Sequence, residues 1–432
     1  MLAQPVPLAE IAAALSSGER DLVEMVEAIL RRIDEVDPQV QALVPESNRR
    51  ERLLAEAHAL QDRYPDPADR PLLYGVPLGV KDIFRVDSLP TQAGTALPSE
   101  LFDALQASCV SILKQHGALV IGKTVTTEFA YAAPGPTRNP HNLDHTPGGS
   151  SSGSAAGVAA GLFSQAIGTQ TVGSVIRPAA YCGIVGYKPS YGRIDPTGVI
   201  FFAQSLDHVG LFTPDVEGMA LAASVLCRDW QPGAASSELP TLGVPDGPYL
   251  DQASAEGLTA FEGQIEQLKA AGYTVVRVSA LEDIREIAYR HVQLMSYELA
   301  ENHAEWFAEF EDRYRPATAQ LIREGQDIDR LAAQAAVSGQ EMVRRDLETR
   351  MADFNIDLWI SPAATGPAPE GLDSTGDSAM NLPWTHAGLP TVTIPAGIAA
   401  NGLPLGLQCA SAYGMDERLL QWAVGLEGVF NG

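Results

Sequence analysis

The chain has 432 residues, of which 45% are hydrophobic and 19% charged, so it is long enough for a large domain with a sizeable core. Its 29 basic and 54 acidic residues give a formal net charge of −25, which repels phosphate backbones and argues against direct binding of nucleic acid. No apolar stretch approaches the length of a bilayer-spanning helix, so we expect no membrane contact.

The first residues have no positive start leading into an apolar run, so we expect no secretion signal. The four cysteines are far apart and form no CxxC pair; they are Cys109, Cys182, Cys227 and Cys409. This spacing predicts buried, reduced thiols in a cytoplasmic protein rather than a metal site. We expect neither a metal nor a cofactor.

Residues 1–66 are predicted to form N-terminal helices, because apolar residues recur there at helical spacing. From residue 70 to about 215, short apolar runs alternate with Gly-, Ser- and Pro-rich turns and with Ala-rich helical stretches. That alternation is typical of an α/β core with much parallel pairing. Residues 232–242 are expected to be a polar connection.

Strand patterns return at residues 241–244 and 274–278, and a charged helical block follows over residues 281–353. Strand character resumes at residue 357, and residues 390–410 are expected to form two strands joined by a turn. Because core-like patterns flank the helical block, the sequence predicts one domain over residues 1–432 with a helical insertion at 281–353. The expected fold class is α/β, a single large domain with a mixed, mostly parallel central sheet flanked by helices.

One short motif matches the phosphate-binding pattern GxxxxGK[ST] at residues 117–124. The pattern requires an open loop, but its four middle residues here are Ala, Leu, Val and Ile, which favour a strand. No helix start is evident after Thr124 either. The sequence therefore favours a strand, with nucleotide binding as an alternative.

Two further motifs indicate serine nucleophiles. Residues 149–153 match the GxSxG elbow around Ser151, but a polar loop precedes them where the elbow requires a buried strand. Residues 111–114 match SxxK, but no SDN or KTG segment accompanies them. We interpret the first match as accidental and the second as a helix surface.

A longer pattern occupies residues 147–189. A Gly/Ser-rich loop that contains Ser150 precedes a helical stretch of small residues, and a second such loop ends at Ser174. Gly/Ser-rich turns before Ala-rich helices often reflect tight packing alone. Two of them in succession nevertheless suggest backbone N–H groups that converge on an anion or an oxyanion. The residues alone do not decide which serine attacks.

This pattern resembles the signature of the amidase signature family. Residues 75–82 are similar to the family's catalytic-lysine strand, and further similar segments lie at 127–130, 136–140, 205–210 and 381–390. The resemblance is strong over residues 70–215, which we call the signature core, and moderate over 355–425. It is weak in the N-terminal helices and in the 281–353 block.

The resemblance implies a Ser–cisSer–Lys triad, with Ser174 as nucleophile, Ser150 as the bridging serine on a cis peptide and Lys81 as base. The apolar run before Lys81 would lower its pKa through burial, and Asp82 would oppose this if it pointed inward. A histidine base remains an alternative, since His141, His145 and His208 lie near core segments.

The backbone N–H groups of Thr171, Val172 and Gly173, with that of the nucleophile, are expected to form the oxyanion hole. Two residues of this loop depart from the family pattern: Gln170 stands where an aspartate is usual, and Val172 where a glycine is usual. Arg177 falls three residues after the nucleophile instead of two. It is expected either to brace a turn through backbone carbonyls or to bind a substrate carboxylate.

The sequence thus predicts hydrolysis of a carboxylic amide to an acid plus ammonia or an amine, through an acyl-enzyme. The expected partner is a small-molecule amide, possible substrates include those that bear a carboxylate, and a homodimer is left open. Two alternatives remain: the amidase subunit of a tRNA-dependent amidotransferase, and a non-catalytic scaffold, suggested by Val172.

Overall fold

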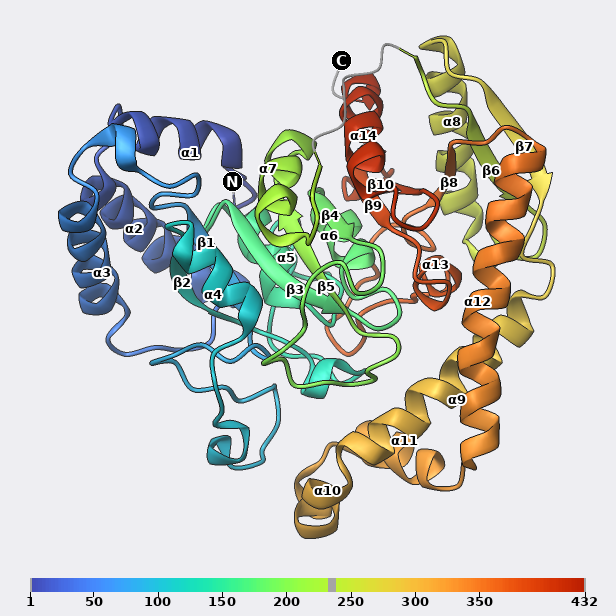
Figure 1. Ribbon diagram of the computed structural model, residues 1–432, viewed down its shortest axis with the longest axis horizontal. Coiled ribbons are helices and arrows are strands. Elements are labelled where there is room, and N and C mark those ends of the chain that lie inside the picture. The colour runs from blue at the N-terminus through green and yellow to red at the C-terminus, as the bar shows by residue number, and fades with distance from the viewer. Residues whose placement is uncertain (1, 232–237, 431–432) are drawn as a thin grey trace.

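The structure is a computed structural model, and it describes residues 2–231 and 238–430 (Figure 1). One ten-stranded sheet runs through this part of the chain, in the order β2-β1-β3-β5-β4-β9-β10-β8-β6-β7. The strands are β1 (Pro77–Lys81), β2 (Leu119–Thr124), β3 (Gln165–Gln170), β4 (Val185–Lys188), β5 (His208–Thr213), β6 (Leu242–Asp246), β7 (Val275–Ser279), β8 (Leu358–Pro362), β9 (Thr391–Ile398) and β10 (Pro404–Ala410).

The strand pairing confirms a mixed sheet but not a mostly parallel one. Among the described strands, four pairings are parallel, β1 with β2 and β3, and β6 with β7 and β8. Five are antiparallel, and all lie in the middle of the sheet. For one of these pairings the reason is connection length: β9 and β10 are joined by five residues, too few for a parallel crossover, and their hairpin lies between the two parallel ends of the sheet.

Helices cover the sheet and extend beyond both of its ends. They are α1 (Leu8–Ser17), α2 (Leu22–Val40), α3 (Arg49–Arg63), α4 (Ser108–Gln115), α5 (Ser152–Ala159), α6 (Ile176–Cys182), α7 (Val216–Leu226), α8 (Ala255–Ala270), α9 (Ile284–Asn302), α10 (Ala304–Phe310), α11 (Pro316–Gln326), α12 (Arg330–Asp353), α13 (Leu382–His386) and α14 (Asp416–Phe430). Short 3₁₀ turns occur at η1 (Pro67–Asp69), η2 (Ser99–Phe102), η3 (Glu128–Ala130), η4 (Leu250–Gln252) and η5 (Glu311–Arg313). None of the described helices is long and apolar enough to cross a membrane.

The first three helices lie beside β1 and β2, and α9 to α12 lie beyond the opposite end of the sheet (Figure 1). The expected N-terminal helices and the expected helical block at 281–353 are therefore both present. All described strands share one sheet, which is consistent with a single domain; that division stays a prediction. Residues 232–237 of the expected polar connection lie outside the described residues.

Small residues allow α5 to pack deep in the molecule, where every one of its residues is buried. A Cβ at Gly153 would lie 2.1 Å from the carbonyl oxygen of Ala42, and one at Gly157 would lie 2.1 Å from the ring of Phe163. Contacts this short cannot be relieved without moving backbone or a packed ring. The Gly/Ser/Ala-rich sequence is therefore what lets α5 lie against the strands that carry the site.

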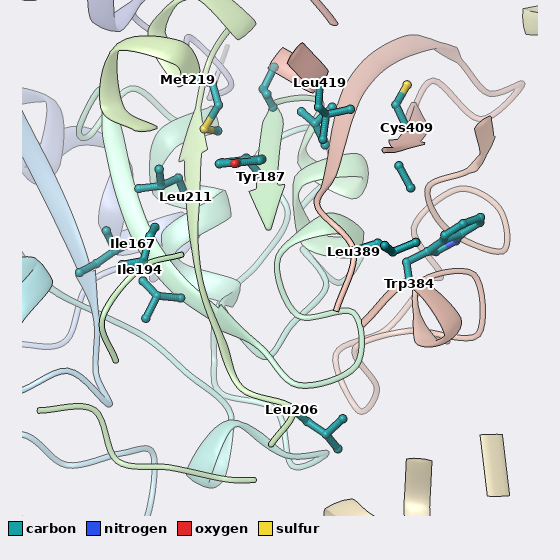
Figure 2. Close-up of a cluster of buried hydrophobic side chains, with 14 of the residues drawn as sticks. Ile167, Tyr187, Ile194, Leu206, Leu211, Met219, Trp384, Leu389, Cys409 and Leu419 are labelled. Carbon is teal, nitrogen blue, oxygen red and sulfur yellow. The ribbon is translucent and has the colours of Figure 1, made fainter. Parts of the chain in front are cut away.

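The main core lies around the middle strands. Figure 2 shows Tyr187 from β4 and Leu211 from β5 close to Met219 from α7 and Leu419 from α14, all of them buried. Alternate residues of these strands point toward the helices on this side. The core thus holds β3, β4 and β5 in fixed positions, and the loop after β3 carries Ser174.

Candidate active site

Lys81 is the last residue of β1 and is 0% exposed. Because β1 and β3 are parallel, their carboxyl ends meet at one edge of the sheet. There, Lys81 Nζ donates to Ser150 Oγ at 2.7 Å and to Thr169 Oγ1 at 2.8 Å. Burial lowers the pKa of Lys81 from 10.5 to about 7, and the negative charge of Asp207 opposes this effect.

Asp82 points away from Lys81 and forms a buried ion pair with Lys123, at 2.7 Å from Asp82 Oδ1 to Lys123 Nζ. It therefore leaves the low pKa of Lys81 in place. Lys123 belongs to the motif that matched a phosphate loop, and residues 119–124 of that motif form strand β2, in which all six residues are buried. The structure contradicts the nucleotide-binding alternative, because the backbone groups of a paired strand cannot form an open phosphate nest.

The backbone of Ser150 is held by hydrogen bonds to its own carbonyl oxygen and to that of Gly149. The peptide bond between Gly149 and Ser150 is cis. Its carbonyl oxygen accepts a hydrogen bond from the N–H of Thr127 at 3.2 Å. The carbonyl oxygen of Gly149 accepts one from Arg177 at 2.7 Å. These contacts fix the backbone of Ser150, so its hydroxyl is directed at Lys81.

Ser174 lies in the loop between β3 and α6 and is 8% exposed. Gln170 shapes this loop, since its Oε1 accepts from the N–H groups of Val175 at 2.8 Å and Ile176 at 3.0 Å. Those groups belong to the first turn of α6, where backbone donors lack partners within the helix. The Ser174 hydroxyl has no hydrogen-bond partner among the described residues, and it remains available to a substrate.

The side chain of Thr385 sets the direction of the peptide between Val172 and Gly173. Thr385 Oγ1 donates to the carbonyl oxygen of Val172 at 2.6 Å and accepts from Gln170 Nε2 at 2.9 Å. In a trans peptide the C=O and the following N–H point in opposite directions. With its carbonyl oxygen held by Thr385, this peptide therefore directs the Gly173 N–H away from Thr385.

The residues just before α13 pack against the loop of residues 171–174. A Cβ at Gly173 would lie 2.3 Å from Asn381 Oδ1 and 2.9 Å from the Cβ of Ser378, so only glycine fits there. Val172, the departure from the family pattern, is not among the residues with positive φ, and its partly buried side chain packs against the core. A valine thus occupies this position without backbone strain.

A buried carboxylate supports the other side of the loop. Asp207 Oδ1 accepts from Thr171 Oγ1 at 2.5 Å, and its Oδ2 accepts from the N–H groups of Phe202 and Ala203 at 2.7 and 3.0 Å. Burial raises the pKa of Asp207 to about 6, and its hydrogen bonds and Lys81 oppose the increase. The arrangement joins a low-pKa lysine to Ser150 and places a braced loop of backbone donors after β3, whereas no hydrogen bond links Ser150 to Ser174 among the described residues.

Comparison with known proteins agrees with this geometry. A family model described as Amidase matches residues 24–420. The chain belongs to the Amidase family. The A-subunit of glutamyl-tRNA(Gln) amidotransferase from Thermus thermophilus is 32% identical, over 97% of this chain and 96% of that protein. The protein of the same name from Geobacter metallireducens is 30% identical, over 96% of this chain and 95% of that protein.

Solved structures confirm the α/β amidase fold. One described as the crystal structure of amidase has a TM-score of 0.88 at 29% identity and covers 98% of this chain and 100% of its own. The peptide amidase from Stenotrophomonas maltophilia has a TM-score of 0.82 at 25% identity, over 99% of this chain and 97% of its own. The resemblance inferred from the sequence is therefore confirmed, and the chain is an Amidase-family hydrolase.

Within this Amidase-family site, Arg177 is buried and contacts backbone. Its terminal nitrogens donate to the carbonyl oxygens of Gly376 at 3.0 Å and Gly149 at 2.7 Å, and to Thr375 Oγ1 at 3.1 Å. These contacts occupy both terminal nitrogens, while the buried Nε has no hydrogen-bond partner among the described residues. The geometry favours the bracing role, in which Arg177 ties the Ser150 loop to residues 375–376.

The remaining sequence candidates occupy structural positions. Ser151 is fully buried, and its hydroxyl donates to the carbonyl oxygen of Thr169 at 3.2 Å; a loop, not a strand, precedes it. The SxxK match lies on α4. His141, His145 and His208 each donate to a backbone carbonyl oxygen, at 2.9, 2.9 and 2.6 Å. Within the described chain, no cluster of three His, Cys, Asp or Glu side chains could hold a metal.

The residues after Thr127 connect the site to the helical insertion. The buried Glu128 accepts from the N–H of Arg315 and, at 2.6 Å, from Thr318 Oγ1, both at the start of α11. Phe129, with a φ of 46°, stacks on Tyr314 at 5.4 Å between ring centroids. The segment of residues 127–130, which contacts Ser150, is therefore held against the helical insertion at residues 281–353.

Four residues of the site were missed by sequence reasoning, namely Thr169, Asp207, Thr385 and Asn381. Asp207 and the last two lie in segments that resembled the family, at 205–210 and 381–390, so the segments were found but not the roles. Thr169 lies in β3, just before the loop that carries Ser174, and alternation along the strand places it on the same face as Ile167.

Proposed function

We propose that this protein hydrolyses a carboxylic amide to an acid plus ammonia or an amine, through an acyl-enzyme on Ser174. The observation that carries the proposal is the 2.7 Å hydrogen bond between Lys81 Nζ and Ser150 Oγ, together with a Lys81 pKa of about 7. An exposed lysine is protonated at neutral pH and cannot act as a base. A buried lysine of this pKa is about half neutral there.

The proposed reaction begins with proton transfer along the triad. Neutral Lys81 takes the Ser150 hydroxyl proton while Ser150 takes the proton of Ser174, whose oxygen attacks the amide carbonyl carbon. The oxyanion that forms is bound by backbone N–H groups of the 171–174 loop, of which that of Gly173 points away from Thr385. When the C–N bond breaks, Ser150 returns a proton to the leaving nitrogen. Water then attacks the ester, and the acid is released.

A fluorophosphonate probe tests the nucleophile. The wild-type protein should be labelled on Ser174, and Ser174→Ala should remove the labelling and the release of ammonia or amine from an amide library. Ser151→Ala is the matched control. Ser151 follows Ser150 in the first Gly/Ser-rich loop, but its hydroxyl forms hydrogen bonds only with the backbone of Thr169 in β3. The proposal fails if Ser174→Ala is still labelled or still turns over amides, and an unlabelled, inactive wild type would favour a scaffold.

A second candidate is the amidase subunit of a tRNA-dependent amidotransferase. It is favoured by the names of the amidotransferase relatives, which match at 30–32% identity over nearly the whole chain. In that case Ser174 would take its acyl group from glutamine, and the ammonia would be used by a partner protein. Co-purification of a partner chain and glutamine-dependent amidation of a charged tRNA would support it. Rapid turnover of free amides by the isolated chain would favour the first proposal.

A further inference from the structure

A pocket of about 180 Å³ lies between α12, the end of α13 and the segment that joins β4 to β5. Its polar lining consists of Tyr191, Ser205, Gln340, Arg344, Thr385 and His386. No acidic side chain of the described residues contributes to it. The lining is therefore polar and includes no carboxylate, although Glu298 lies directly behind it and accepts from the N–H and the hydroxyl of Ser205.

His386 is 0% exposed, yet neither of its ring nitrogens has a hydrogen-bond partner among the described residues. Buried polar groups are hydrogen-bonded in the large majority of cases, so an unpaired ring that lines a cavity indicates a missing partner. Burial lowers the pKa of His386 to about 4, so the ring is neutral and has one N–H to donate. His291 of α9 lies 5.5 Å away between ring centroids, and its buried ring lies beside the backbone of Thr171.

Arg344 supplies the positive charge of the pocket. Its Nε donates to the carbonyl oxygen of Ala387 at 2.7 Å, and its guanidinium carbon lies 4.2 Å from the ring centre of Tyr413. These contacts fix the plane of the group. Glu348, one turn further along α12, instead accepts from the N–H of Tyr413. No carboxylate of the described residues lies within 4.0 Å of the Arg344 nitrogens, so its terminal N–H groups lack an ionic partner.

The pocket lies next to the loop of residues 171–174, whose backbone N–H groups are the expected oxyanion donors. Thr385, which lines it, holds the carbonyl oxygen of Val172 and the side chain of Gln170. Because C=O and N–H of a trans peptide point in opposite directions, the pocket lies on the side of the loop away from the Gly173 N–H. It is therefore separate from the place where a substrate carbonyl oxygen binds.

We propose that this pocket is an effector site for a small carboxylate, which pairs with Arg344 and accepts the N–H of His386. A planar guanidinium and a carboxylate match each other in two parallel hydrogen bonds. At about 30 Å³ per water, the volume equals about six waters, enough for an acid of about six to eight heavy atoms. Thr385 already holds the Val172 carbonyl oxygen without a ligand; an occupied pocket packs against Thr385 and increases the population in which this contact is made, so the ligand raises kcat. The effect on kcat rests on the proposed function, whereas binding does not.

Binding is tested on the Ser174→Ala protein, where no turnover interferes. Succinate should raise its melting temperature with saturation, and 1,4-butanediol, of similar size but uncharged, should not. Adding Arg344→Gln should weaken succinate binding by about tenfold or more, since a hydrogen bond between charged groups is lost. Arg345→Gln is the matched control, because the neighbouring Arg345 is exposed and pairs with Glu341 on the helix surface. Its binding should be unchanged.

Turnover by the otherwise wild-type protein then tests the coupling. Succinate should raise kcat about fivefold or more with little change in KM, a coupling in the usual allosteric range. Arg344→Gln should remove the increase, and Thr385→Val should retain binding but lose the effect on kcat. Absence of saturable binding, or equal binding by Arg344→Gln, would overturn the site. Binding that raises KM alone, by competition with the amide, or that leaves kcat unchanged, would overturn the effector role.

Discussion

The neutral form of Lys81 is the base in the proposed reaction, so the rate should follow the titration of this residue. Its pKa is about 7 instead of 10.5, because the ammonium loses its water in a fully buried position. Below pH 7 the neutral fraction falls tenfold per unit. At pH 5.5, kcat/KM should therefore be about 30-fold below its plateau at pH 8.5 to 9.

The measurement is the pH profile of kcat/KM for an amide, together with the rate of fluorophosphonate labelling, which requires no leaving amine. Asp207 titrates nearby, with a pKa of about 6, so the assignment needs a control. In Asp207→Asn the negative charge that stabilises the ammonium is removed, and the acidic limb should move to lower pH if it belongs to Lys81. A profile that is flat from pH 5.5 to 9, or a midpoint near 10, would refute the reasoning.

The same titration affects stability. The difference between 10.5 and about 7 corresponds to a cost of about 5 kcal/mol for a protonated Lys81 in the folded state. Between these pH values the unfolded chain binds the proton and the folded chain does not, so this contribution makes stability rise with pH. At and below pH 7 the cost is fully present. Lys81→Met should therefore gain in melting temperature relative to wild type at pH 6, and the gain should shrink as the pH rises and disappear only above pH 10.5.

Three further outcomes follow from the site geometry. Thr385→Val should lower kcat about 10- to 100-fold with little change in KM, because a misdirected Gly173 N–H costs part of the roughly 2.7–4 kcal/mol typical of an oxyanion donor; an unchanged kcat would exclude the role. Arg177→Lys should lower the melting temperature and reduce kcat/KM equally for acidic and neutral amides, whereas a selective rise in KM for acidic amides would restore the carboxylate-binding hypothesis. Asp82→Asn leaves Lys123 buried without its partner and should reduce the free energy of unfolding by about 3–5 kcal/mol in urea titrations, a loss that Asp87→Asn on the exposed loop should not show.

The parts of this fold that follow from local patterns were predicted correctly from the sequence. The run before Lys81 is a strand, the phosphate-loop match is β2, and the block at 281–353 is helical. Strand direction was not predictable in the same way. Which strands become neighbours depends on long-range packing, so the antiparallel hairpin of β9 and β10 could not be placed in the middle of the sheet.

In the site, too, residues within recognisable segments were predicted from the sequence, whereas contacts between distant segments were not. Resemblance to the family pointed to Lys81 and Ser150, and the structure brings these two into a hydrogen bond across 69 residues of sequence. The contact between Thr385 and Val172 spans 213 residues, and nothing in either local segment indicates it. Gln170 was noted as a departure from the family pattern. Its amide accepts from the N–H groups at the start of α6 and donates to Thr385 Oγ1, whereas a carboxylate could only accept and would compete with Val172 for the Thr385 hydroxyl proton.

The contacts of Glu128 and Phe129 with α11 limit how this scaffold can be engineered. Exchanging the insertion for that of another family member would remove the Thr318 hydroxyl, and it would displace the N–H at residue 315 wherever the new backbone follows a different path. A carboxylate would then be left buried directly after Thr127, whose N–H holds the Ser150 carbonyl oxygen. An exchanged insertion meant to alter substrate specificity would thus also disturb residues 127–130, which hold the backbone of Ser150. The unit to transplant is therefore the insertion together with residues 127–131, and chimeras that separate the two should be expressed as poorly folded, inactive proteins.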